Sequence, residues 1–188
     1  LVGNSGKATL DIIDGGQVTS NTSILLANSA SGEGVVTVSG LGSLMRQNQF
    51  RVGYRGKGTL NITSGGTVDS TGLASIGFSA GSSGEIHING SNSLFSSQDN
   101  VFVGTSGKGV ITIANGGQLS ASGYISAGSA SSGEGTISIS DLGSELTTPL
   151  DFFIGGSGKA ALNITNGGQV TATNNTIMAN AANSESTV

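Results

Sequence analysis

The chain has 188 residues with a net charge of −4, 33 glycines, one proline and no cysteine. Only seven residues are basic, which argues against a nucleic-acid partner, because phosphate binding requires a stripe of positive charge. Without cysteine there are no disulfides and no thiolate chemistry, and no apolar run approaches the length of a membrane-spanning helix. Abundant glycine among recurring Ile, Val and Leu predicts many short strands joined by tight turns.

An internal repeat dominates the sequence. Four similar segments begin about 51 residues apart and read VGNSGKATLDIIDGGQV, VGYRGKGTLNITSGGTV, VGTSGKGVITIANGGQL and IGGSGKAALNITNGGQV. A weaker copy follows each of the first three: SGEGVVTVSGLGSL, SSGEIHINGSNSL and SGEGTISISDLGSEL. The structural unit is therefore about 25 residues long, and strong copies (A units) alternate with weak copies (B units).

The first predicted strand of each unit alternates apolar and polar residues. Its inward pairs are Leu10/Ile12, Val36/Val38, Leu60/Ile62, Ile86/Ile88, Ile111/Ile113, Ile137/Ile139 and Leu162/Ile164. A period of two indicates a strand with one face in a core.

Two further short strands complete each unit. The second strand contributes the inward column Val18, Leu44, Val68, Leu94, Leu119, Leu146 and Val170. The third contributes the inward pairs Leu25/Ala27, Phe50/Val52, Ala74/Ile76, Val101/Val103, Ile125/Ala127, Phe152/Ile154 and Ile177/Ala179. Three strands per unit predict one triangular coil, and stacking of coils buries the inner faces. The sequence thus predicts an all-β parallel solenoid of about seven coils.

The repeat also predicts the domain organisation. We expect a single β-helix segment over residues 1–188, with A/B coil pairs near 1–50, 51–101, 102–152 and 153–188. Both ends fall within a repeat and lack the polar cap that a solenoid needs for solubility, so we expect a fragment of a longer protein.

One turn position alternates in charge along the chain. Its residues are Lys7, Glu33, Lys57, Glu85, Lys108, Glu134, Lys159 and Glu185. Coils stacked in register would place opposite charges about 5 Å apart along one edge. We interpret the series as a structural charge ladder that fixes the register, rather than a charged binding strip, because alternation cancels the field that a partner would experience.

A second column suggests partner binding. The residues between the inward positions of the third strand are Leu26, Arg51, Ser75, Phe102, Ser126, Phe153 and Met178. Four of these are large and apolar on a face that should meet water, which indicates either a partner-binding surface or a face covered by another segment. Arg46, Arg51, Arg55 and Lys57 also lie close together in the sequence and could bind an acidic glycan, although a chance cluster is the alternative.

The sequence offers little chemistry for catalysis. The single histidine, His87, lies between two inward residues and is expected to point outward. The acidic residues are scattered and do not form a paired site in adjacent coils, as glycoside hydrolysis requires. We therefore expect no enzyme activity, no catalytic residue, no cofactor and no metal.

The A unit V-G-x-S-G-K-G-x-L-x-I-x-x-G-G-x-V and the B unit S-G-E-G-x-V-x-V-S-G-x-G-S-x-L resemble passenger-domain repeats of bacterial autotransporters, the type V secreted adhesins. The resemblance covers nearly the whole chain. It implies a right-handed, single-stranded parallel β-helix at the cell surface of a Gram-negative bacterium. Attachment to the outer membrane would depend on a C-terminal translocator barrel that this segment lacks.

The same resemblance implies a function, since such passengers commonly mediate adhesion, self-association and biofilm formation. The expected function is an adhesin or self-association segment that binds laterally along the rod. Its partner would be another copy of itself, a host surface glycan or a matrix protein, and not nucleic acid. One alternative is an inert stalk that displays a distal functional domain, and another is a polysaccharide-acting β-helix enzyme or a tail fibre.

Overall fold

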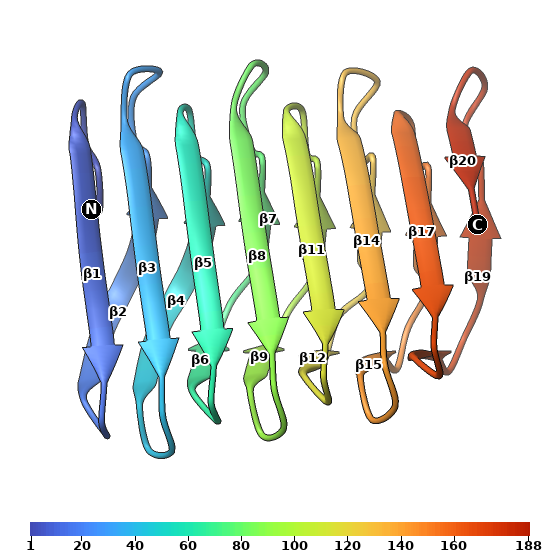
Figure 1. The fold of residues 1–188 in the computed structure, drawn as a ribbon. Helices are drawn as coiled ribbons and strands as arrows, with labels where there is room; N and C mark the ends of the chain where they lie inside the picture. The colour runs from blue at the N-terminus through green and yellow to red at the C-terminus, as the bar shows by residue number, and fades with distance from the viewer.

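The computed structural model describes residues 1–188, which form twenty strands in two parallel sheets and no helix (Figure 1). The eight-stranded sheet contains β1 (Lys7–Ile13), β3 (Glu33–Ser39), β5 (Lys57–Thr63), β8 (Ser83–Asn89), β11 (Lys108–Ala114), β14 (Glu134–Ser140), β17 (Lys159–Thr165) and β20 (Glu185–Thr187). We call this sheet the first side of the rod.

The twelve-stranded sheet bends and forms the other two sides. The second side contains β6 (Thr67–Ser70), β9 (Leu94–Ser97), β12 (Gln118–Ala121), β15 (Glu145–Thr148) and β18 (Gln169–Ala172). The third side contains β7 (Ala74–Ile76), β10 (Val101–Val103), β13 (Ile125–Ala127), β16 (Phe152–Ile154) and β19 (Thr176–Met178). The long strands β2 (Gln17–Leu26) and β4 (Leu44–Val52) pair with each other along both sides.

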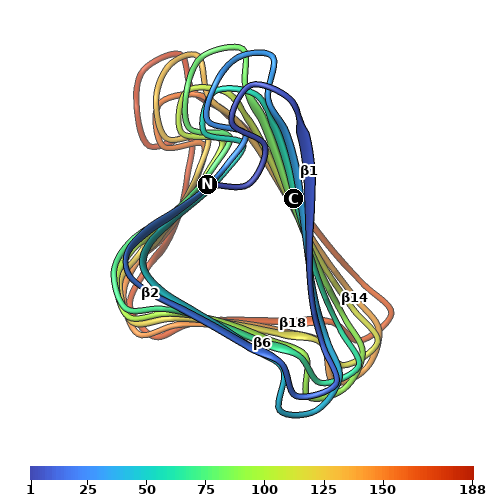
Figure 2. The same cartoon turned by 90° about the vertical axis from the view of Figure 1, so that its left-hand side faces the viewer.

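The chain winds as a right-handed helix. Seen from the N-terminal end in Figure 2, the chain descends through the first side at the right, crosses the second side and rises through the third side, so it turns clockwise as it recedes. Residues paired on neighbouring coils, such as Val52 with Ile76 and Val103 with Ala127, lie about 25 positions apart. The predicted all-β, right-handed parallel β-helix of about seven coils is confirmed.

Stacked columns of apolar side chains fill the interior. On the first side, Ile12 pairs with Val38 and Val38 pairs with Ile62, as the alternating pattern predicts. These three side chains are almost fully buried within a continuous core of 32 residues. Burial of each such side chain contributes about 1.5–3 kcal/mol before the loss of conformational entropy, so the stacked columns supply the main stabilisation.

The predicted inward column of the second side is wrong at two positions. Met45 and Phe95 occupy the core, with no exposed surface, whereas Leu44 and Leu94 point outward and are partly exposed. The neighbouring column residue Val68 pairs with both Met45 and Phe95. The one-residue shift arises because the turn before each of these strands contains an additional buried serine.

That serine bridges two coils. Ser93 Oγ donates a hydrogen bond to the carbonyl oxygen of Asn89 (2.8 Å) and accepts one from the backbone N–H of Gly65 in the preceding coil (3.1 Å). Ser43 makes the same two bonds in the first B unit, to Ser39 and Gly15. The hydroxyl thus satisfies backbone groups inside the corner, which explains why one residue of the turn is fully buried.

On the third side, the predicted inward and outward positions are wrong in the first and the last coil. Leu26 has no exposed surface and pairs with the core residue Val52, so it belongs to the inward column. Met178 pairs with the core residue Ile154 and is 46% exposed in the last coil. The correct outward residues are Leu25 and Ile177, which pair with Arg51 and Phe153, respectively.

The cause of this error lies in the residue that follows each third strand. Most coils use a glycine with positive φ there, such as Gly53 (69°) and Gly104 (70°). Ala27 (60°) and Ala179 (49°) take the same left-handed conformation in their coils. Because alanine rarely adopts this conformation, the sequence suggests inward strand residues where the structure has turn residues.

The charge ladder is continuous except at Glu85. Lys7, Glu33 and Lys57 are in register at one end of the rod. The series Lys108, Glu134, Lys159 and Glu185 is in register at the other end. Direct ion pairs join Lys7 to Glu33 (2.8 Å) and Lys159 to Glu185 (3.0 Å).

Ser83, not Glu85, lies between Lys57 and Lys108. Glu85 pairs with Thr59 and Val110 instead, two residues further along the strand. The predicted membership of Glu85 in the ladder is therefore wrong. The reason is that Glu85 directly precedes the core residue Ile86, whereas Lys57 lies three residues before the equivalent Leu60, so Gly84 aligns with Gly58 and Ser83 with Lys57.

Candidate functional site

The aromatic residues divide cleanly between the core and one outer surface. The chain has six phenylalanines, two tyrosines and no tryptophan. Phe50, Phe95 and Phe152 are fully buried in the core. The other five residues, all partly exposed, are Tyr54, Phe78, Phe102, Tyr124 and Phe153. All five belong to the third side or to the loops beside it.

The outward column of the third side provides the floor of this surface. In register along the rod, its central residues are Arg51, Ser75, Phe102, Ser126 and Phe153. The large residues end B units and the serines end A units. Because Ser75 and Ser126 are small and almost fully buried, a hollow lies above each serine, between two larger neighbours.

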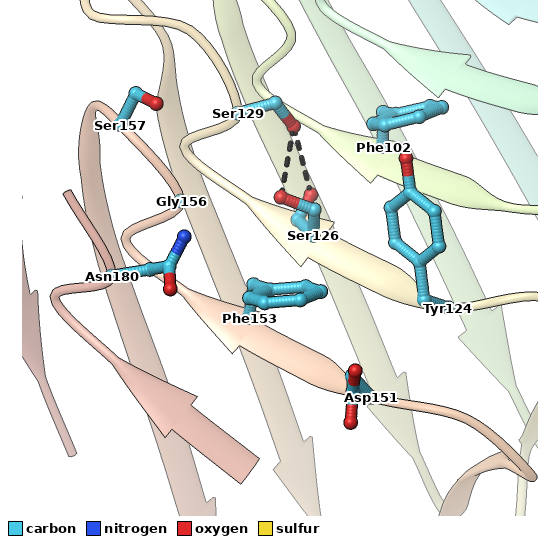
Figure 3. Close-up of a pocket in the computed structure, with 9 residues that line it drawn as sticks. All are labelled: Phe102, Tyr124, Ser126, Ser129, Asp151, Phe153, Gly156, Ser157 and Asn180. Carbon is cyan, nitrogen blue, oxygen red and sulfur yellow. Dashed lines mark hydrogen bonds between the residues drawn. The ribbon is translucent and has the colours of Figure 1, made fainter. Parts of the chain in front are cut away.

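The hollow above Ser126, which we call the Tyr124 hollow, has a volume of about 370 Å³ (Figure 3). The Tyr124 ring stands edge-on to the rings of Phe102 and Phe153, at centroid distances of 5.6 and 5.8 Å. Polar groups surround these rings: Ser126, Ser129, Asp151, Ser157 and Asn180. The hollow therefore combines aromatic surfaces with hydroxyl, amide and carboxylate groups.

Asp151 is held in place by the next coil. Its Oδ1 accepts hydrogen bonds from Asn174 Nδ2 (2.7 Å), Asn175 N (3.0 Å) and Asn175 Nδ2 (3.0 Å). Its Oδ2 has no protein partner among the hydrogen bonds of the structure. One carboxylate oxygen thus fixes the side chain and the other remains free to accept a bond from a ligand.

The hollow above Ser75, which we call the Arg51 hollow, has a volume of about 240 Å³. Arg51, Leu73, Phe78, Phe102 and Thr105 line it, and it shares Phe102 and Ser129 with the Tyr124 hollow. We call the two adjoining hollows together the aromatic groove. The groove follows the rod axis over four coil steps, or about 19 Å at the usual strand spacing.

Arg51 is held by aromatic rings rather than by an acid. Its Cζ lies 4.2 Å from the centroid of Phe78 and 4.9 Å from that of Tyr54, within the range of cation–π attraction. None of the four ion pairs of the structure includes Arg51. Its Nε is buried without a hydrogen-bond partner, and so is Thr105 Oγ1 in the same hollow.

The structure brings together only part of the predicted binding set. Arg51, Phe102 and Phe153 lie in the groove, whereas Leu26 and Met178 belong to the inward column. Arg55 does not line either hollow; its Cζ lies 5.0 Å from the centroid of Tyr54, whose ring lies next to Phe78 of the Arg51 hollow.

Arg46 lies outside the groove. It extends from the second side and its Nε donates a hydrogen bond to Asp69 Oδ2 (2.9 Å). Asp69 also accepts a hydrogen bond from Ser96 (2.9 Å). The arginines that are close in the sequence therefore do not form one basic cluster.

Sequence reasoning missed the loop residues that lie in the groove or next to it. Tyr54 and Phe78 each follow the third-strand column by three positions, and Tyr124 precedes it by two. Asp151 likewise immediately precedes β16. The sequence did contain a signal for them: in a chain with few aromatic residues, large or charged side chains recur next to the third strands.

The groove is lined by aromatic, hydroxyl, amide, carboxylate and guanidinium groups. No group of three or more His, Asp or Glu side chains could hold a metal ion. Asp151 is the only carboxylate that lines the groove, whereas glycoside hydrolysis uses two opposed carboxyl groups. His87 lies on the first side, 3.6 Å from Glu85.

Comparison of the chain with models of protein families, with curated proteins and with solved structures found no match. The structure contains no helix with the length and hydropathy to cross a membrane.

Proposed function

We propose that this chain is a cell-surface rod segment of the autotransporter-passenger type, and that it binds a partner laterally through the aromatic groove. The observation that carries the proposal is the gathering of all five non-core aromatic residues on one side of the rod. Aromatic side chains and arginine are the residues that most often dominate binding energy at protein interfaces. Aromatic rings bury large areas with few rotatable bonds, and the planar guanidinium of arginine stacks on such rings while it donates hydrogen bonds.

The scaffold supports such a role. Each floor residue of the central coils lies on a strand that pairs with the strands of the preceding and following coils. Phe102, for example, is in register with Ser75 and Ser126. Binding groups on paired strands lose little conformational freedom when a ligand arrives, which favours affinity. The passenger-like repeats support display at the cell surface, where the expected partners are a second copy, a surface glycan or a matrix protein.

The proposal can be tested with a Phe102→Ser/Phe153→Ser double variant. A matched control is Leu41→Ser/Leu142→Ser, which removes two leucines that are 75% and 83% exposed in the turns after β3 and β14. Both double variants replace two apolar side chains by serine, but only the first alters the groove.

Sedimentation velocity measures self-association, and a screen against glycans and matrix proteins measures ligand binding. We expect the wild-type chain and the leucine variant to bind, and the phenylalanine variant to lose binding. A wild-type chain that stays monomeric and binds nothing in the screen would contradict the proposal and favour the inert stalk.

A further inference from the structure

The two hollows of the aromatic groove carry opposite charges at their far ends. Arg51 is the only charged residue that lines its hollow, and Asp151 is the only one in the Tyr124 hollow. A ligand that lies along the groove therefore meets a cation at one end, an aromatic centre at Phe102 and an anion at the other end.

Carbohydrate is the ligand chemistry that matches these groups. A sugar ring presents an apolar face of C–H groups and an edge of hydroxyl groups, each of which can donate and accept hydrogen bonds. The groove offers aromatic rings to the faces, and the hydroxyl, amide and carboxylate groups of Ser129, Asn180 and Asp151 to the edges. Its length of about 19 Å fits a chain of sugars rather than one ring.

An extended peptide gains less from this surface. Peptides that bind β-sheets usually add a strand to a free edge and exchange main-chain hydrogen bonds with it. Here the floor strands are interior to the sheet: β10 pairs with β7 and β13, and β13 pairs with β10 and β16. Their main-chain groups are already paired, so only side chains are available to a ligand.

The unpaired arginine indicates which sugar belongs in its hollow. A buried donor without a partner costs free energy, and Arg51 Nε is buried without a hydrogen-bond partner, while no acid pairs with the guanidinium. A carboxylate placed in the hollow could accept bonds from the terminal Nη atoms of Arg51, which are not among its buried atoms. The positive charge of Arg55, which lies over the neighbouring Tyr54 ring, adds to the attraction.

The opposite end favours a neutral sugar. The free Oδ2 of Asp151 can accept a hydrogen bond from a hydroxyl or amide group, but it repels a second carboxylate. The chain as a whole has a net charge of −4 and no basic stripe. Uniform polyanions are therefore not attracted by the whole molecule, and selectivity rests on the single Arg51 hollow.

We propose that the aromatic groove binds an extended glycan with a carboxylate-bearing sugar in the Arg51 hollow and a neutral sugar in the Tyr124 hollow. This inference rests on the proposed function of lateral binding through the groove and specifies the chemical class of the partner.

Isothermal titration calorimetry with defined oligosaccharides tests the inference. The probes are oligosaccharides of hyaluronan, in which acidic and neutral sugars alternate, and of polygalacturonate and polysialic acid, in which every sugar is acidic. Each probe is paired with its carboxyl-reduced form. The variants are Arg51→Gln and Asp151→Asn, with Lys108→Gln as a control that removes one positive charge from the first side. Thermal melting confirms that each variant is folded.

We expect the hyaluronan oligosaccharide to bind most tightly of the acidic probes. Carboxyl reduction or Arg51→Gln should weaken its binding about tenfold, because a charge-assisted hydrogen bond is lost. Lys108→Gln should bind like the wild type. Asp151→Asn should reduce the preference for hyaluronan over oligogalacturonate.

Three results would overturn the inference: equal binding of acidic and carboxyl-reduced forms, equal binding by wild type and Arg51→Gln, or no binding of any acidic probe. Equal affinity of the wild type for hyaluronan and oligogalacturonate would overturn the assignment of a neutral sugar to the Tyr124 hollow. These results can occur while the Phe102→Ser/Phe153→Ser variant loses binding to a different partner. In that case the proposal of lateral binding stands and only the ligand class is wrong.

Discussion

Single polar residues decide how neighbouring coils fit together. The buried hydroxyl of Ser93 shifts the next strand by one residue and satisfies backbone groups in two coils. At the corner where the first-side strands begin, the Lys7–Glu33 pair joins the first two coils at the protein surface. The serine acts through a buried hydrogen bond, whereas the ion pair is exposed to water and salt, so the two contribute differently to stability.

The Lys7–Glu33 pair predicts a pH dependence of stability. The hydrogen bond and charge of Lys7 lower the pKa of Glu33, and the same contacts raise the pKa of Lys7. Because the pKa of Glu33 is lower in the folded state, its contribution is present above the unfolded pKa of about 4.3 and is lost as the pH falls through the folded value. The contribution of Lys7 is complete below about pH 10.4 and is lost as the pH rises through its folded pKa.

Glu33→Gln should therefore lower the melting temperature slightly at pH 7 and have no effect at a pH below the folded pKa of Glu33. Glu145→Gln makes the same change of charge on the second side, where Glu145 belongs to none of the ion pairs of the structure, and serves as the control. High salt should reduce the effect of Glu33→Gln, since exposed pairs are screened. A difference from wild type that is unchanged in strong acid would contradict the ion-pair explanation.

Strands and turns combine to place large side chains at regular intervals. B units end in Arg51, Phe102 and Phe153, and A units end in Ser75 and Ser126, so large and small residues alternate along the outer face of the third side. The loops next to these strands add the remaining aromatic rings. The groove is therefore a consequence of the two-unit repeat rather than of any one coil.

The register of the second side gives a direct test at the level of the strand. Phe95 is fully buried and Leu94 points outward on the same strand. Phe95→Ala should lower the free energy of unfolding by about 3–5 kcal/mol, because it creates a core cavity. Leu94→Ala should cost less than about 1 kcal/mol. Urea unfolding measures both, and the reverse order would show that the strand is shifted by one residue.

The whole molecule is a rod in which each coil contacts only its neighbours. Coils in the middle are paired on both sides: β8 pairs with β5 and β11. Toward the C-terminal end this pairing is incomplete: β20 pairs with only the first three residues of β17, and the apolar residues Ile164 and Met178 are 42% and 46% exposed. Stability in such a solenoid is close to a sum over coils and their interfaces, so it should decline toward the ends.

Amide hydrogen exchange measures this gradient. We expect the amides of β8 and β11 to exchange at least about tenfold more slowly than those of β1 and β20, because local opening at the ends disrupts fewer contacts. Uniform protection across all coils would instead indicate that the rod unfolds as one cooperative unit.

The sequence by itself determined the length of the coil and the inward and outward positions of its first strand. Alternation of apolar residues is local to each strand, so the positions of Ile12, Val38 and Ile62 in one column follow from the repeat alone. The same holds for the outward placement of Arg51, Phe102 and Phe153, whose coils keep a glycine after the third strand.

Only the tertiary structure decided the register at the turns and the composition of the groove. Whether Met45 or Leu44 enters the core depends on a serine that bonds to another coil, a contact that does not exist until the coils stack. Tyr124 meets Phe102 and Phe153 for the same reason, since the three rings belong to different coils. Local periodicity is set by the geometry of one strand, whereas these contacts join residues about 25 positions apart.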